Sequence, residues 1–326
     1  MVRFGISGSE AVHLAIRVAR GYTNKTKFVR FCQNYHGWLE NVFGGEPQVN
    51  ADPPFAKYSP TSPGQSAGRS ATTDLDSYMI PWNDIDALTE LLARHGDDIA
   101  LLIMEPVMCN FGCCPPRPGY LEKVRSLCDD YGVLLCFDEV ITGFRMGLSS
   151  AQGALGVTPD LTILGKALAG GLPLGALAGK RNVMSVLRDG IVLGGGTFNS
   201  FPFAMAGAKY SIERMAKYED ELFSKRNDLQ NKLMNGIKDI GKKHGFEILT
   251  QGAPGIFYLD FCSSDVVYDS AQLLNNDIEL KVRLADRMKE QGILIAGASR
   301  MLLSFAHTAK DIDDTLAATD VAIGQL

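Results

Sequence analysis

The chain has 326 residues, of which 46% are hydrophobic and 21% are charged. This composition is typical of a soluble globular protein, and the length suggests one large domain plus a smaller one. The formal net charge is only −5 and the 32 basic residues are scattered, which argues against a surface that binds nucleic acid or anionic membranes.

The sequence shows no pattern for membrane insertion or secretion. Its apolar runs stay short of the ~18 residues that cross a bilayer, and the first residues lack the apolar core of a signal peptide. The seven cysteines are interpreted as reduced thiols, so we expect a cytoplasmic protein. Cys109, Cys113 and Cys114 form no Cys-x-x-Cys pair and have no histidine cluster nearby, so no metal site is predicted.

In chain order, the first two-thirds alternates helical patterns with apolar runs, as in an α/β domain with a mostly parallel sheet. Continuous apolar runs at 99–104 and 133–137 are typical of strands buried on both faces. The predicted strands are 27–32, 99–104, 133–137 and 161–164, and the predicted helices are 10–20 and 120–131.

The last third of the chain has a different pattern. One or two long helices are expected over residues 203–234, followed by strands within 246–261 and 293–305 and helices at 278–291 and 309–324. The sequence therefore predicts a large domain over 1–223 and a small α+β domain over 224–326.

Residues 44–77 are rich in Pro, Gly, Ser and Asp and show no sustained period. A loop of this length is unusual inside a compact domain. It is either a plain surface loop or a cover for an active site.

Two candidate sites lie at the expected edges of these elements. Gly8 and Ser9 open the first helix, where free N–H groups and a hydroxyl make a phosphate cradle, although a simple helix cap has the same sequence. Asp138 follows a buried strand, at the end where open α/β sheets bind ligands. A buried carboxylate there needs a partner such as a protonated pyridine nitrogen; the alternative is a surface ion pair.

Two further candidates lie later in the chain. Lys166 follows a predicted strand and is flanked by small residues. A partly desolvated lysine has a lowered pKa and becomes an imine-forming nucleophile, whereas a lone lysine is ordinarily a solvated charge. The segment Gly194-Gly195-Gly196-Thr197 offers N–H groups and a hydroxyl to an anion.

Taken in order, these motifs resemble fold type I enzymes that use pyridoxal 5′-phosphate (PLP), in particular the class III aminotransferases and their glutamate-1-semialdehyde 2,1-aminomutase branch. The resemblance rests on residues 2–11, Tyr35-His36-Gly37, Glu105-Pro106-Val107, Asn110, residues 138–145, 158–173, 196–198 and 304–308. It implies a mostly parallel sheet flanked by helices, with a smaller C-terminal α+β domain.

The resemblance also implies catalytic roles. Lys166 would hold PLP as a Schiff base and shuttle a proton between substrate and cofactor. Asp138 would pair with the pyridine nitrogen, so that the ring acts as an electron sink. Gly8 and Ser9 would bind the phosphate.

Further positions of the resembling motifs complete the expected cofactor site. Tyr35 and Val140 would sandwich the ring, Asn110 would lie near its phenolic oxygen, and Glu105 would support the site. His36 belongs to the same site, with a packed, hydrogen-bonded histidine as the alternative to a base. Thr197 would reach the phosphate of a neighbouring subunit, which implies a homodimer.

The chain departs from the family pattern in two places. Family members carry a substantial segment before the Ser-Gly-Ser-Glu-Ala turn, so this N-terminal segment is expected to be missing here. On the C-terminal strand, Ser304 stands where many members have arginine, in agreement with the aminomutase branch. Ser299 replaces the acidic residue of that branch, and the adjacent Arg300 either contacts an anion or faces solvent.

The expected function is PLP-dependent amino-group transfer on an amino acid or amino-carbonyl substrate. One alternative is an aminomutase of the glutamate-1-semialdehyde type. The other is a truncated or degenerate homologue that binds PLP without turnover. The cofactor motifs alone do not separate the two reactions, because both use the same residues.

Overall fold

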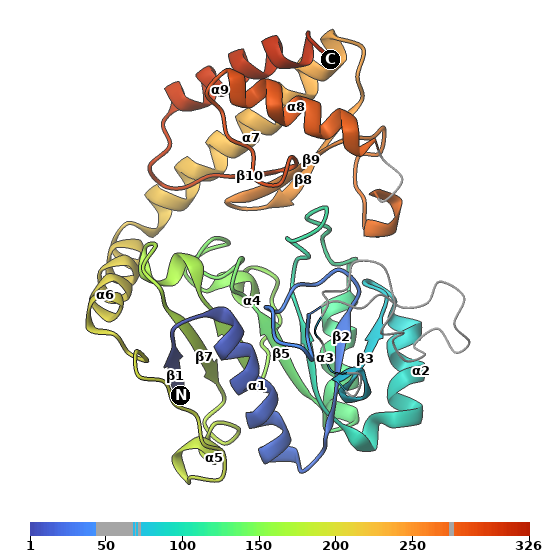
Figure 1. Ribbon diagram of the computed structural model, residues 1–326, viewed down its shortest axis with the longest axis vertical. Coiled ribbons are helices and arrows are strands. Elements are labelled where there is room, and N and C mark those ends of the chain that lie inside the picture. The colour runs from blue at the N-terminus through green and yellow to red at the C-terminus, as the bar shows by residue number, and fades with distance from the viewer. Residues whose placement is uncertain (44–67, 69, 71–72, 274–276) are drawn as a thin grey trace.

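The computed structural model describes residues 1–43, 68, 70, 73–273 and 277–326. A large part is built on a seven-stranded sheet, and a smaller part with its own three-stranded sheet lies above it in Figure 1. Within these described residues, no helix is both long and apolar enough to cross a membrane.

The large sheet has the strand order β1–β7–β6–β5–β4–β2–β3. Its five-strand core is parallel. At one edge β7 pairs antiparallel with β6, and β1 pairs antiparallel with β7. The prediction of a mostly parallel sheet is confirmed. The strands are β1 (Val2–Gly5), β2 (Lys27–Phe31), β3 (Ser77–Ile80), β4 (Ile99–Met104), β5 (Leu134–Asp138), β6 (Leu161–Leu164) and β7 (Gly175–Gly179).

Helices cover both faces of this sheet. Phe28, Leu101 and Ile103 face the core under α1, whereas Val29 and Leu102 face the opposite core under α2 and α3. Burial on both faces is why these strands are continuous apolar runs. The helices of this part are α1 (Gly8–Thr23), α2 (Ile85–His95), α3 (Tyr120–Asp130), α4 (Ser150–Ala154) and α5 (Ser185–Arg188), with 3₁₀ turns η1 (Thr73–Asp76), η2 (Gly96–Asp98) and η3 (Lys166–Ala169).

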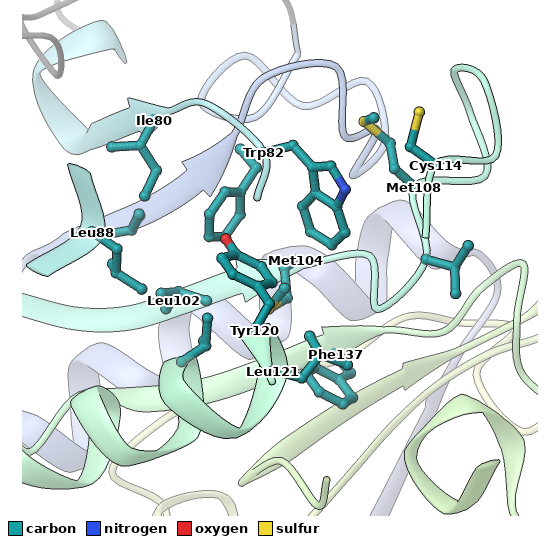
Figure 2. Packing of buried hydrophobic residues seen from close by; sticks show 14 of the residues in the cluster. Ile80, Trp82, Leu88, Leu102, Met104, Met108, Cys114, Tyr120, Leu121 and Phe137 are labelled. Atoms are coloured by element: carbon teal, nitrogen blue, oxygen red, sulfur yellow. The ribbon is translucent and has the colours of Figure 1, made fainter. Parts of the chain in front are cut away.

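Figure 2 shows the core beneath α2 and α3, which is rich in aromatic side chains. The Trp82 ring meets Phe31 edge-on at 5.7 Å and Tyr120 at 5.6 Å. Such edge-to-face pairs stabilise the fold beyond the contribution of the apolar area that the rings bury. They fix the strand β2 and the helix α3 relative to each other, and hence the loops that follow β2 and β4.

Two long helices, α6 (Pro202–Lys217) and α7 (Glu219–Lys243), lead into the smaller part, and α7 packs into its core. This part contains the antiparallel strands β8 (Ile248–Ala253), β9 (Ile256–Phe261) and β10 (Arg300–Leu302), the helices α8 (Ile278–Glu290) and α9 (Ala309–Ile323), and the turn η4 (Ser270–Leu273). Leu233, Ile237, Phe257 and Leu284 belong to its separate apolar core. The boundary that we predicted at 223/224 lies inside α7.

Several predicted elements are confirmed to within a few residues, and 99–104 and 161–164 match β4 and β6. The long strand expected within 293–305 is shorter. Gly297 and Ala298 adopt positive φ, and Ala296 bridges Arg300, so the chain reverses and only Arg300–Leu302 forms a strand. Most of the segment 44–77 lies outside the described residues, so its role as a cover stays a prediction.

Candidate active site

A cavity of about 360 Å³ lies where the carboxyl ends of β4, β5 and β6 meet the start of α1. Gly8, Ser9, Tyr35, His36, Asn110, Asp138, Val140 and Lys166 all line it. These residues come from motifs spread over more than 150 positions. The structure therefore brings the predicted site residues together, with one exception: Thr197, which lies on an exposed loop outside this cavity.

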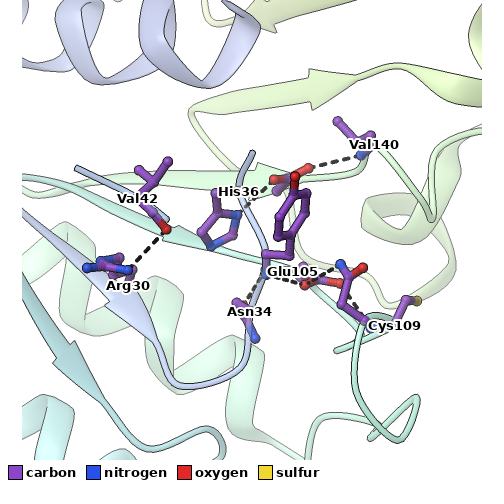
Figure 3. A network of polar contacts seen from close by, with 10 residues as sticks. Arg30, Asn34, His36, Val42, Glu105, Cys109 and Val140 are labelled. Atoms are coloured by element: carbon purple, nitrogen blue, oxygen red, sulfur yellow. Dashed lines mark hydrogen bonds and ion pairs between the residues drawn. The ribbon is translucent and has the colours of Figure 1, made fainter. Parts of the chain in front are cut away.

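Asp138 and His36 form a buried pair at the end of β5 (Figure 3). The Asp138 Oδ2 atom lies 2.8 Å from His36 Nδ1, and Asp138 Oδ1 accepts the Val140 N–H at 3.1 Å. The side chains of His36 and Asp138 are 1% and 5% exposed. Among the described residues, no lysine or arginine is paired with Asp138. The carboxylate is therefore held rigidly in the cavity wall and can accept a cationic partner from the cavity.

Glu105, just beyond β4, ties the loop after β4 to the loop after β2. Its Oε1 atom accepts the Tyr35 N–H at 2.8 Å and the Asn110 side chain at 2.9 Å, while Oε2 accepts the Cys109 N–H at 3.0 Å. Burial raises the pKa of Glu105, and the hydrogen bonds from Asn110 and Tyr35 act in the opposite direction. This carboxyl group is thus a structural support for the loops that carry Tyr35 and Asn110.

Arg300 reaches the same network from β10. Its Nη1 atom donates to Asn110 Oδ1 at 3.1 Å, and its side chain is partly buried. Of the two alternatives for Arg300, exposure to solvent alone is therefore wrong. The guanidinium lies at the edge of the site, 190 positions from Asn110 in sequence.

The start of α1 is open toward the cavity. Ser7 is the helix cap and accepts the Glu10 N–H, so Gly8 and Ser9 occupy the first helical positions, whose N–H groups have no partner within the helix. A Cβ on Gly8 would lie 3.0 Å from Val140 Cγ2. A Cβ on Gly37 would lie 2.4 Å from Ser9 Oγ. The close approach of these loops forms a narrow cradle with the positive end of the helix dipole.

Lys166 begins η3 directly after β6 and has φ of +43°, in the left-handed region that non-glycine residues rarely occupy. Burial lowers the pKa of its amine, and the positive charges of Arg145 and Arg300 lower it further, against the raising effect of Asp138 and Glu105. A larger share of neutral amine, the nucleophilic form, is the consequence.

Tyr35 and a Gly-rich turn also belong to the wall of this cavity. Tyr35 is 45% exposed, so it is no ordinary core residue, and its ring meets Phe43 edge-on. Outside the cavity wall, His307 accepts the Ser304 N–H through Nδ1, as fits a structural histidine. Gly171 to Leu174 also line the cavity. This Gly-rich turn closes the Lys166 motif at 158–173, but no separate role was predicted for it.

The residues present fit PLP. A phosphate needs N–H donors, which the cradle at α1 offers, and a protonated pyridine nitrogen needs a buried carboxylate, which Asp138 offers. The aldehyde needs an amine of lowered pKa, which Lys166 offers. All three groups line one cavity.

Comparisons with known proteins agree with this geometry. The chain is 35% identical over 330 residues to glutamate-1-semialdehyde 2,1-aminomutase 2 of Exiguobacterium sibiricum, covering 100% of this chain and 73% of that protein. It is 36% identical over 327 residues to glutamate-1-semialdehyde 2,1-aminomutase of Methanobrevibacter smithii, covering 99% and 74%.

A solved omega-transaminase from Sphaerobacter thermophilus has the same fold, with a TM-score of 0.91 at 28% identity over 99% of this chain and 74% of that one. Residues 1–322 match the family described as aminotransferase class-III. The chain therefore belongs to the class III aminotransferases, enzymes of fold type I that use pyridoxal phosphate.

Proposed function

We propose that the cavity beside Lys166 is the PLP site and that Lys166 holds the cofactor covalently. The observation that carries this proposal is the convergence of Lys166, the Asp138–His36 pair and the open start of α1 on one cavity. When bound, PLP supplies an electron sink that stabilises negative charge on the substrate carbon.

Each surrounding residue has a task in this proposal. Asp138, oriented by His36, holds the positive charge of the pyridine nitrogen. The N–H groups of Gly8 and Ser9 hold the phosphate. The Lys166 amine, once free, moves the proton at the substrate carbon, because its lowered pKa raises the share of neutral amine that can act as a base.

Tyr35 and Val140 lie against the two faces of the ring in this proposal, and Asn110 lies at its phenolic oxygen. Asn110 is held there by Glu105 on one side and Arg300 on the other. A guanidinium at this position is suited to the carboxylate of an amino acid substrate.

We favour amino-group transfer between two small molecules. Ser299 stands in place of the acidic residue expected from the aminomutase branch, and the adjacent Arg300 supplies a cation beside Asn110. The second candidate is the aminomutase reaction, which the names of the relatives at 35–36% identity favour.

Turnover assays separate the two reactions. Conversion of glutamate-1-semialdehyde by the PLP-loaded protein without any added amino acceptor would identify an aminomutase. Transfer from an amino acid or amine that depends on an added 2-oxo acid would identify an aminotransferase. Absence of both in a protein that binds PLP would favour a homologue without turnover.

We further propose a cytoplasmic homodimer with a large domain over 1–223 and a small domain over 224–326. Thr197 lies on a loop whose large apolar side chains are exposed: Ile191 by 67%, Leu193 by 71% and Phe198 by 62%. Such a patch favours a protein partner. A second copy would cover it and bring Thr197 toward the neighbouring cavity.

A further inference from the structure

A second cavity, of about 710 Å³, adjoins the first on the other side of Lys166. Lys166 and Gly171 belong to the walls of both. The second cavity lies between the turn after β5, the helices α6 and α7, and residues 303–306 that follow β10. Figure 1 shows these elements meeting where the small part faces the carboxyl ends of the parallel strands.

Arg226 of α7 lines this cavity and is only 3% exposed. Its Nη2 atom donates to the Arg145 carbonyl and to Asn227 Oδ1, and its guanidinium lies 5.2 Å from the ring centres of Phe223 and Phe305. Its Nε atom is buried and has no hydrogen-bond partner. No carboxylate among the described residues is paired with it. A buried cation without an anion is costly.

Arg145 lines the same cavity and is likewise without a carboxylate partner within the described part of the chain. Its Nη1 atom donates to the Ile141 carbonyl. A Cβ on Gly255 would lie 3.1 Å from Arg226 Nη1 and 3.3 Å from Arg145 Cδ, so the two arginine side chains pack against the same glycine. Two neighbouring cations thus share one cavity wall.

The charge of this wall persists at neutral pH. Burial lowers the pKa of Arg226 to about 10, and the neighbouring charge of Arg145 contributes to that decrease. A pKa of about 10 still leaves the side chain protonated at pH 7. Arg214, which is exposed, adds a third cation to the lining.

We propose that Arg145 and Arg226 bind a carboxylate of the small molecule that reacts at Lys166. Guanidinium groups bind carboxylates through two parallel hydrogen bonds, and the shared wall places this anion site next to the reacting amine. That the bound molecule also reacts at Lys166 rests on the proposed function. That Arg145 and Arg226 bind a carboxylate does not.

Calorimetric titration of the PLP-loaded chain with succinate tests the site, with acetate and inorganic phosphate as comparison ligands. The variants are Arg145→Gln and, as a matched control, Arg287→Gln, which changes an exposed arginine of α8. We expect succinate to bind about 10-fold or more weakly to Arg145→Gln, because roughly one charge-assisted contact is lost. Its affinity for Arg287→Gln should be unchanged. Arg226→Lys, which keeps the charge, is expected to weaken binding less than Arg226→Gln.

Equal succinate affinity in wild type and Arg145→Gln, or no succinate binding at all, would overturn the proposal. Binding of phosphate but not of succinate would also overturn it, because the wall would then serve a phosphate. Titration of Lys166→Ala separates this proposal from the proposed function. If that variant keeps Arg145-dependent succinate binding, the anion site stands even where covalent attachment of PLP fails.

Discussion

Asp138 illustrates, at the scale of single residues, how a carboxylate is prepared for a cationic partner. One oxygen is bound by His36 and the other by the Val140 N–H, so the group is oriented without being neutralised by a lysine or arginine of the described chain. His36 is accordingly interpreted as a positioning residue, which acts on the cofactor through Asp138.

Replacing His36 tests this positioning role. His36→Leu removes the hydrogen bond to Asp138, and we expect PLP to bind about 10-fold more weakly, the cost of one hydrogen bond to a charged group. His36→Asn retains a donor and should recover part of the affinity. Equilibrium titration of the apoprotein with PLP measures both, and equal affinity in His36→Leu and wild type would refute the role.

The pKa of Lys166 gives a prediction of pH dependence. Above this lowered pKa the amine is neutral and reacts with an aldehyde, so the rate of PLP uptake should rise with pH through it. Arg145→Gln removes a positive charge that lowers the pKa, so the midpoint of the pH profile should move upward. Stopped-flow absorbance measures the profile. An unmoved or lowered midpoint would contradict the electrostatic assignment.

The site residues that could be predicted from the sequence are those carried by short motifs, such as Lys166, Asp138 and the Tyr-His-Gly tripeptide. Arg226 could not be predicted, because its role depends on how α7 packs against the turn that carries Arg145. The contact between Arg300 and Asn110 likewise depends on the tertiary fold. Thr197 remains a prediction, since its expected partner is a second subunit.

At the scale of elements, Asp160 holds β5, β6, α3 and the end of β7 together. Its carboxylate accepts the Leu135 N–H at 2.8 Å, Arg125 Nη1 at 2.9 Å and Lys180 Nζ at 2.6 Å. Burial raises the pKa of Asp160, but these hydrogen bonds and the charge of Arg125 outweigh it and lower the pKa below its ordinary value of 3.8.

Asp160→Asn should therefore lower the free energy of unfolding. We expect a loss of about 2 kcal/mol at pH 7, because Arg125 loses its buried partner and keeps only the exposed Asp129, while the half-exposed Lys180 contributes little. A lowered pKa stabilises the fold above 3.8, and that contribution is lost as pH falls through the folded-state value. Denaturant unfolding at several pH values should thus show that the difference in free energy of unfolding between wild type and Asp160→Asn shrinks in acid. A difference that does not depend on pH would argue against the ion pairs.

The elements that could be predicted are those with a strong periodic or continuous apolar pattern, such as α1, β4 and α8. The two antiparallel-paired strands β1 and β7 were not predicted, because β1 is short and β7 has the sequence Gly-Ala-Leu-Ala-Gly, with little β-forming character. The pairing of β7 with β6, and of β1 with β7, is decided by the tertiary fold.

At the scale of the whole molecule, the exposed apolar loop around Thr197 predicts a dimer. Leu193→Glu would place a charge in the proposed interface, so sedimentation should show a shift from twice the mass of the chain toward the mass of one chain. Leu294→Glu is a matched control, because Leu294 is also exposed, by 83%, but lies in the small part. Wild-type chain that sediments as a monomer at micromolar concentration would exclude the dimer.

The most direct test of the account is the visible absorption spectrum of the PLP-loaded protein, compared with Lys166→Ala and with the exposed-lysine control Lys209→Ala. Wild type and the control should show a band of protein-bound PLP, and borohydride should fix the cofactor to the peptide that contains Lys166, as mass spectrometry would detect. Lys166→Ala should lack both signals. A well-folded wild type without the band, or fixation at another lysine, would contradict the assignment of Lys166.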